Sequence, residues 1–237
     1  MEKIRLFCLP YAGASAHVFL KFRKGLHPSI ELSPVELAGR GSRMDEPFHN
    51  GIAAAARDVY SRIQGDMEHR PYAFWGHSMG GLIVFEVLHL AKAAGIPDPR
   101  HVFLSACRAP QAVKRSRAVH KLSDEDLKEE ILLMGGTPPE ALEQEEFLRL
   151  FLPVLRADYR AVETYEFPGD RPKLTCDITA VGGDRDALPV QEMLGWREVT
   201  QGGFRMIRLS GDHFFIHDNV EAMAGLFNSV LTGGENP

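Results

Sequence analysis

A serine between two glycines carries the clearest chemical signal in the sequence. Residues 76–81 read Gly-His-Ser-Met-Gly-Gly and match G-x-S-x-G. In this motif a tight turn between a strand and a helix exposes a nucleophilic serine, and the N–H after it faces the developing oxyanion. The pattern is short and also occurs in inert glycine-rich turns, but here an apolar run precedes it (72–76) and an apolar helical segment follows it (82–94). We therefore predict Ser78 as the nucleophile and the Met79 N–H as an oxyanion donor.

A histidine and two aspartates near the end of the chain would complete a catalytic triad. In hydrolases with this turn the order is Ser, then Asp or Glu, then His. His213 follows a predicted strand at 204–209, and Asp184 and Asp186 follow another at 174–181. We favour Asp186, because the loop needs length after its strand to reach the histidine; Asp184 is the alternative. The carboxylate would hold His213 as general base, and a structural loop histidine is the other interpretation of His213.

The second oxyanion donor is expected from the loop after the first predicted strand. That strand covers residues 4–10, and the sequence then continues Tyr-Ala-Gly-Ala-Ser. Hydrolases of this type take the second backbone N–H from a loop near the start of the sheet. We predict the Ala12 N–H, with Tyr11 as the next candidate.

The elements that must position these residues alternate along the chain. Short apolar runs predict strands and 3.6-residue periodicity predicts helices. Strands are expected at 4–10, 30–37, 72–76, 101–107, 174–181 and 204–209, with one or two more in weaker segments, and helices at 51–67, 82–94 and 220–231. Such alternation favours an α/β fold with a mostly parallel sheet between helices.

Residues 108–171 interrupt the alternation. Helical spacing continues after a capping Ser123 and again over 140–165, where Pro153 is predicted to break or start a helix. We expect a helical lid insertion over the carboxyl edge of the sheet, where ligands bind in α/β folds. A helical layer packed on the sheet edge is the alternative. No linker divides the chain, so 1–237 is expected to be one domain.

Composition and charge argue against several classes of protein. The net charge of −5 disfavours a nucleic-acid-binding protein. Three cysteines without C-x-x-C spacing disfavour a disulfide framework or a zinc site and favour the cytoplasm. His213 and His217 are four residues apart but lack an H-E-x-x-H pattern, so we expect no metal. No apolar run approaches the ~20 residues that span a bilayer, and the N-terminal apolar run is too short for a signal peptide.

Several further segments resemble the type II thioesterases, the discrete editing enzymes of non-ribosomal peptide synthetases (NRPS) and polyketide synthases (PKS). They are LPYAGASA at 9–16, ELAGRGSR at 36–43 followed by EP at 46–47, GHSMG at 76–80, FLPVLRADY at 151–159 followed by ETY at 163–165, WR at 196–197 and GDHFF at 211–215. The resemblance covers nearly the whole chain. Two residues depart from it, Ala14 where the family has glycine and Ala38 where it has proline.

The resemblance implies an α/β-hydrolase fold with Ser78, Asp186 and His213 as the triad and the N–H groups of Met79 and Ala12 as the oxyanion hole. It implies acyl groups on the phosphopantetheine arms of acyl or peptidyl carrier proteins as substrates, and removal of stalled or aberrant acyl groups as the function. No cofactor is needed for this chemistry, and a monomer is expected.

Five basic residues are candidates for docking the phosphate of such an arm or an acidic carrier helix. They are Arg40, Arg43, Lys114, Arg115 and Arg117. Solvated surface charge is the alternative interpretation. Three other functions stay open: a general carboxylesterase, an acyltransferase of the same fold, and a catalytically inactive scaffold. A fluorophosphonate probe that failed to label Ser78 would favour the scaffold.

Overall fold

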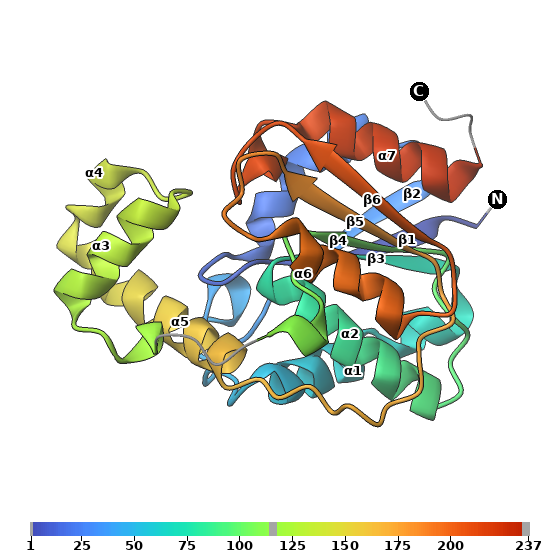
Figure 1. Ribbon diagram of the computed structural model, residues 1–237, viewed down its shortest axis with the longest axis horizontal. Coiled ribbons are helices and arrows are strands. Elements are labelled where there is room, and N and C mark those ends of the chain that lie inside the picture. The colour runs from blue at the N-terminus through green and yellow to red at the C-terminus, as the bar shows by residue number, and fades with distance from the viewer. Residues whose placement is uncertain (1, 114–117, 234–237) are drawn as a thin grey trace.

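A six-stranded parallel sheet forms the centre of the computed structural model, which describes residues 2–113 and 118–233 (Figure 1). The strands are β1 Ile4–Leu9, β2 Ile30–Pro34, β3 Tyr72–His77, β4 Val102–Ser105, β5 Ile178–Gly183 and β6 Phe204–Leu209. Their order is β2-β1-β3-β4-β5-β6, and every pairing is parallel. All carboxyl ends therefore meet at one edge of the sheet, with β3 near its middle.

Helices cover both faces of this sheet. Helices α1 (Ile52–His69) and α2 (Met79–Ala93) pack on one face, and α7 (Val220–Thr232) packs on the other together with a 3-10 helix at Ala16–Gly25 (Figure 1). In β3, Phe74 and Trp75 are fully buried, in the first and the second apolar core respectively. Alternate side chains of a strand point to opposite faces, so this burial on both sides explains why β3 reads as a continuous apolar run. The mostly parallel α/β fold is confirmed.

An excursion of helices lies between β4 and β5. It contains α3 (Asp124–Met134), α4 (Pro139–Leu142) and α5 (Glu145–Glu163), which share an apolar cluster of their own. Figure 1 shows α3 and α4 to one side of the sheet, with α5 running from them toward α1 and α2. The shorter elements of the described chain are α6 (Val190–Leu194) and 3-10 helices at Gly41–Arg43, Pro110–Ala112, Val119–Lys121, Gly195–Val199 and Phe215–His217.

Most element bounds agree with the sequence prediction, and two differences have physical reasons. Strand β5 begins at Ile178, because Leu174, where the prediction began, makes only an isolated bridge to Thr200. The prediction that Pro153 breaks or starts a helix was wrong, since α5 continues through it. Pro153 lies on the exposed side of α5, where water can bind the carbonyl that loses its N–H partner.

Burial disfavours the charged form of five histidines of the described chain, namely His49, His77, His89, His101 and His217. Burial lowers the pKa of His89 and of His101 to about 4, and it lowers the pKa of His77 well below its ordinary value. In the unfolded chain a histidine titrates near pH ~6.5. Between these values the unfolded state binds more protons than the folded state, so the free energy of unfolding falls as the pH falls.

We expect urea denaturation to show this loss of stability between pH 7 and pH 5. His101→Gln is expected to reduce the slope of unfolding free energy against pH by about one proton near pH 5, because one histidine no longer takes up a proton on unfolding. An exposed histidine provides the control: His69→Gln, whose side chain is 80% exposed, is expected to leave the slope unchanged. Equal slopes for wild type and His101→Gln would contradict the prediction.

Candidate active site

Ser78 is the single residue between the end of β3 and the start of α2. Its backbone has φ 52° and ψ −117°, a conformation that a residue with a side chain adopts at a cost of about 1–3 kcal/mol. Its N–H donates to the Ser105 carbonyl at 2.8 Å, which ties the turn to β4. The predicted turn therefore exists, and it exposes Ser78 at the carboxyl edge of the sheet.

Gly80 allows this turn to approach the end of β1. A Cβ atom at residue 80 would lie 2.1 Å from the Leu9 carbonyl oxygen, a distance that real Cβ atoms do not reach. The chain after Leu9 continues directly into the loop that carries Ala12. The missing side chain at Gly80 thus brings the start of α2 and this loop together.

Ser78, His213 and Asp186 form a continuous chain of hydrogen bonds. Ser78 Oγ lies 3.0 Å from His213 Nε2, and His213 Nδ1 lies 3.0 Å from Asp186 Oδ2. The other carboxylate oxygen, Asp186 Oδ1, accepts the Leu188 N–H at 2.9 Å. The three residues follow β3, β5 and β6, so the shared carboxyl edge of the parallel strands brings them together.

The environment of Asp186 favours its ionised form. Its side chain is 4% exposed, and this burial alone would raise the pKa of the carboxyl. The hydrogen bond and the charge of His213, with the Leu188 N–H, outweigh burial and hold the pKa of Asp186 below its ordinary value. A carboxylate at this place fixes the tautomer of the ring and stabilises an imidazolium.

The alternative carboxylate, Asp184, makes different contacts. Its side chain is 48% exposed, and its Oδ1 accepts the Gly211 N–H at 2.9 Å. It holds the backbone of the loop that carries His213 and makes no hydrogen bond to the histidine ring. The geometry brings Asp186 to His213 and leaves Asp184 in the turn.

The two predicted oxyanion donors lie at the same edge. Met79 is the first residue of α2, so its N–H has no acceptor within the helix. Ala12 belongs to residues 10–16, which we call the opening loop, and its N–H donates to no protein acceptor in the described part of the chain. The neighbouring Tyr11 is fixed through its hydroxyl, which lies 2.9 Å from His217 Nε2.

An apolar cavity of about 350 Å³ lies between the opening loop and the helical excursion. Phe214, next to His213, lies on its wall, and so do Tyr11 and Ala12. The opening loop also contributes Gly13 and Ala14, and Val18 follows it. Most of the remaining wall comes from α3, α4, α5 and the segment that joins α3 to α4: Ile131, Met134, Gly135, Gly136, Thr137, Pro138, Ala141, Phe147, Phe151, Leu155 and Tyr159. An apolar acyl chain would fit a cavity with such a wall. None of these wall residues outside the opening loop was a predicted site residue.

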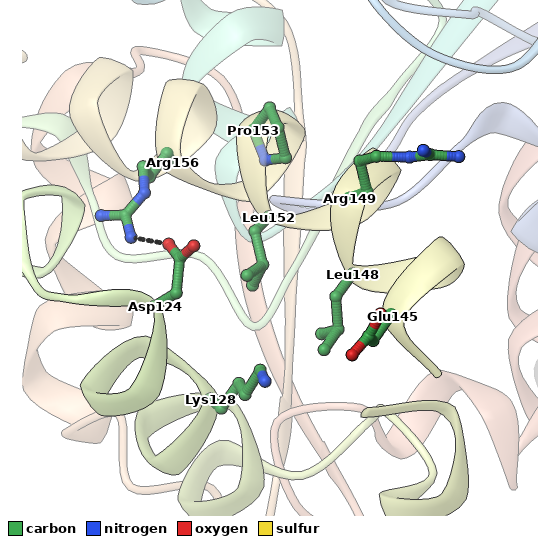
Figure 2. Close-up of a pocket in the computed structure, with 8 residues that line it drawn as sticks. All are labelled: Asp124, Lys128, Glu145, Leu148, Arg149, Leu152, Pro153 and Arg156. Atoms are coloured by element: carbon green, nitrogen blue, oxygen red, sulfur yellow. Dashed lines mark hydrogen bonds and ion pairs between the residues drawn. The ribbon is translucent and has the colours of Figure 1, made fainter. Parts of the chain in front are cut away.

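A larger hollow of about 590 Å³ lies between α3 and α5 and contains none of the predicted site residues (Figure 2). Five of its eight wall residues are charged. Figure 2 shows the ion pair between two of them, Arg156 and Asp124, which lie 2.5 Å apart. Since none of the triad residues lines this hollow, we assign it no role in acyl transfer.

The docking interpretation of Arg40 and Arg43 is not supported by their surroundings. Both residues are under 10% exposed. Arg40 is paired with Asp158, and Arg43 with Asp58 and Glu46. A guanidinium already paired inside the protein offers no free surface to a carrier, so we correct the prediction for both residues. Lys114, Arg115 and Arg117 lie outside the described residues.

The described chain contains neither a cluster of metal-ligating side chains nor a membrane-spanning helix. No group of three or more His, Cys, Asp or Glu side chains is arranged to hold a metal ion within residues 2–113 and 118–233. Over the same residues, no helix has both the length and the apolar character needed to cross a membrane.

Comparison with known proteins identifies the family of this chain. The family model described as the thioesterase domain matches residues 4–231. Thioesterase PikA5 of Streptomyces venezuelae is 38% identical over 218 residues, which cover 91% of this chain and 76% of that protein. ClbQ from the colibactin NRPS/PKS pathway superposes with a TM-score of 0.92 at 35% identity over 98% of both chains. The type II thioesterase BorB from the borrelidin biosynthetic cluster superposes with a TM-score of 0.88 at 33% identity, covering 97% of this chain and 93% of that one. The chain therefore belongs to the thioesterase family, among the type II thioesterases, and is a thioester hydrolase.

Proposed function

We propose that this thioesterase removes stalled or aberrant acyl groups from the phosphopantetheine arms of carrier proteins in an NRPS or PKS, through an acyl-enzyme on Ser78. The observation that carries the catalytic part is the hydrogen-bonded chain from Ser78 through His213 to Asp186. The carrier-protein part is supported by relatives such as ClbQ, which is named for an NRPS/PKS pathway.

The mechanism follows from the geometry of the site. His213 takes the proton of Ser78 as Oγ attacks the thioester carbonyl, and Asp186 stabilises the imidazolium. The N–H groups of Met79 and Ala12 bind the oxyanion of the tetrahedral intermediate. The C–S bond then breaks, and the thiolate, whose conjugate acid has a pKa of about 8.5, leaves readily and takes the proton from His213. His213 next activates a water molecule, which hydrolyses the acyl-enzyme and restores Ser78.

The acyl chain is proposed to lie in the 350 Å³ cavity between the opening loop and the helical excursion. The cavity wall near the triad is apolar, with Phe214 beside His213 at a ring-centroid distance of 5.3 Å. Because α3 and α5 form the far wall, residues 108–171 are proposed to act as a lid whose position determines access to this cavity.

The test compares two substrates of equal acyl length, one on a phosphopantetheinylated carrier protein and one as a p-nitrophenyl ester. Hydrolysis of the carrier thioester is expected to dominate, because carrier binding adds to the recognition of the acyl chain. Dominant ester cleavage would indicate a general carboxylesterase, and transfer to an added alcohol or amine would indicate an acyltransferase.

The same assay tests the remaining docking candidates. Reversing the charge of Lys114, Arg115 and Arg117 together is expected to raise KM for the carrier substrate and to leave the p-nitrophenyl ester unaffected, because an electrostatic contact with the carrier is lost. An equal effect on both substrates would remove these residues from the docking proposal.

A further inference from the structure

The opening loop is held on both sides of Ala12, while the Ala12 N–H has no protein acceptor within residues 2–113 and 118–233. After it in sequence, the Gly13 N–H donates to Asp158 Oδ2 at 2.8 Å, and the Ala14 carbonyl accepts from Arg40 Nη1 at 3.3 Å. Before it, Tyr11 is fixed through its contact with His217. The position of the Ala12 N–H is therefore determined by side chains that are distant in sequence.

Arg40 and Asp158 meet in a two-pronged ion pair inside the protein. Arg40 Nη1 reaches Asp158 Oδ2 at 2.5 Å, and Nη2 reaches Oδ1 at 2.7 Å. The two side chains are 6% and 8% exposed. A bidentate arginine–carboxylate pair fixes the carboxylate in orientation as well as in position. The same oxygen that receives Arg40 Nη1 also accepts the Gly13 N–H, so the pair sets where Gly13 lies.

The carboxylate belongs to α5, and the contact between α5 and the opening loop is close. Phe151, Leu155 and Asp158 have the i, i+4, i+7 spacing of one helix face. A Cβ atom at Gly13 would lie 2.9 Å from Leu155 Cδ1 and 3.0 Å from Phe151 Cε2. The loop thus rests on the same face that carries Asp158 and lines the acyl cavity. Any displacement of α5 must move Gly13.

We infer that Asp158, held by Arg40, is a positioning residue that sets the Ala12 N–H of the oxyanion hole and couples it to the helical insertion. The inference rests on the proposed function, because it assigns the Ala12 N–H to the oxyanion. Asp158 touches no reacting atom, and its effect passes through Gly13. In the inferred arrangement, the oxyanion hole is complete only when α5 packs on the opening loop.

Asp158→Ala is expected to lower kcat for an acyl thioester about 10- to 100-fold and to change KM less than about threefold, since a misplaced donor weakens transition-state binding selectively. Asp158→Asn is expected to lower kcat less than Asp158→Ala, because the amide oxygen of asparagine can still accept the Gly13 N–H. Arg40→Lys is expected to lose kcat as well, because an ammonium cannot make the two-pronged pair.

Two other ion pairs provide matched controls. Asp58→Asn disrupts the pair of the similarly buried Arg43, and Asp124→Asn removes the partner of Arg156 within the insertion (Figure 2). The side-chain hydrogen bonds and ion pairs of the two aspartates in the described structure go to Arg43, Arg62, His49 and Arg156, outside the opening loop. Both controls are expected to keep kcat within about twofold of wild type, in contrast to the loss expected when an oxyanion donor is misplaced.

Inhibitor binding separates positioning from general loss of structure. A trifluoromethyl ketone analogue of the acyl chain forms a tetrahedral adduct with Ser78 and places an oxyanion in the hole, whereas an unreactive amide analogue only fills the cavity. In Asp158→Ala the affinity for the ketone is expected to fall by the same factor as kcat/KM, with the amide affinity unchanged. Equal losses for both inhibitors, or an equal kcat loss in Asp58→Asn, would overturn the inference. Failure of the proposed function would give a different result from either of these outcomes, because hydrolysis of the acyl thioester would then survive the Ser78→Ala substitution.

Discussion

Ser78→Ala is expected to reduce kcat for acyl-carrier hydrolysis by about 10⁴- to 10⁶-fold, because the attacking oxygen is removed and its partners act only together with it. The KM is expected to change little, since the wall of the acyl cavity does not include this side chain. Single-turnover hydrolysis of a radiolabelled acyl carrier measures so large a loss reliably. A loss smaller than tenfold would contradict the assignment of Ser78.

A glycine variant shows whether the loss comes from chemistry or from unfolding. Ser78 has φ 52°, where a side chain is strained and glycine is not. We therefore expect Ser78→Gly to be as inactive as Ser78→Ala, yet more stable to urea than Ser78→Ala by up to about 1 kcal/mol. An inactive protein that is more stable than its alanine counterpart excludes unfolding as the reason for lost activity.

The central part of the fold was predictable because its signals are local. The strand β3 is buried on both faces and so appears as a continuous apolar run, and the Gly-x-Ser-x-Gly sequence marks the turn after it. In a parallel sheet, knowing that a residue follows a strand is enough to place it at the common edge. The positions of Ser78 and His213 relative to the sheet could therefore be predicted from the order of elements alone.

The contacts made by the charged side chains could not be predicted in this way. Arg40 and Arg43 lie in a glycine-rich segment with the appearance of an exposed loop. Arg43 pairs with Glu46 and Asp58 nearby in the sequence, but Asp158, the partner of Arg40, is 118 residues away. No periodicity links positions so far apart. An arginine is therefore placed at the surface or in the interior only once the fold has determined which carboxylate it meets.

Pro153 illustrates the same limit for a local signal. Proline disfavours a helix interior, which led to the predicted break, but α5 tolerates it on its exposed side. On either side of the proline, the side chains of Leu152, Val154 and Leu155 are buried. Tertiary packing of the helix thus outweighs the local preference of a single residue.

Asp186→Asn is expected to lower kcat by about 10⁴-fold. Asp184→Asn is expected to keep kcat within about tenfold of wild type. The contact that it weakens is one hydrogen bond between a carboxylate and a backbone N–H, with the modest free energy of such a bond. Both substitutions remove one negative charge from the same loop, so each is the control for the other. The two residues differ in contact: Asp186 reaches His213 Nδ1 at 3.0 Å, and Asp184 reaches the Gly211 N–H.

The size of the expected loss follows from the proton on His213. The Asp186 carboxylate accepts the Nδ1–H and leaves Nε2 free to take the Ser78 proton, while an asparagine NH₂ at this place would favour the wrong tautomer. Because His213 holds the pKa of Asp186 below its ordinary value, the carboxylate stays ionised well below neutral pH, and wild-type kcat is not expected to fall in mildly acidic solution through protonation of Asp186. Steady-state kcat of the two variants between pH 6 and pH 9 tests this assignment. A larger loss in Asp184→Asn than in Asp186→Asn would transfer the third position of the triad to Asp184.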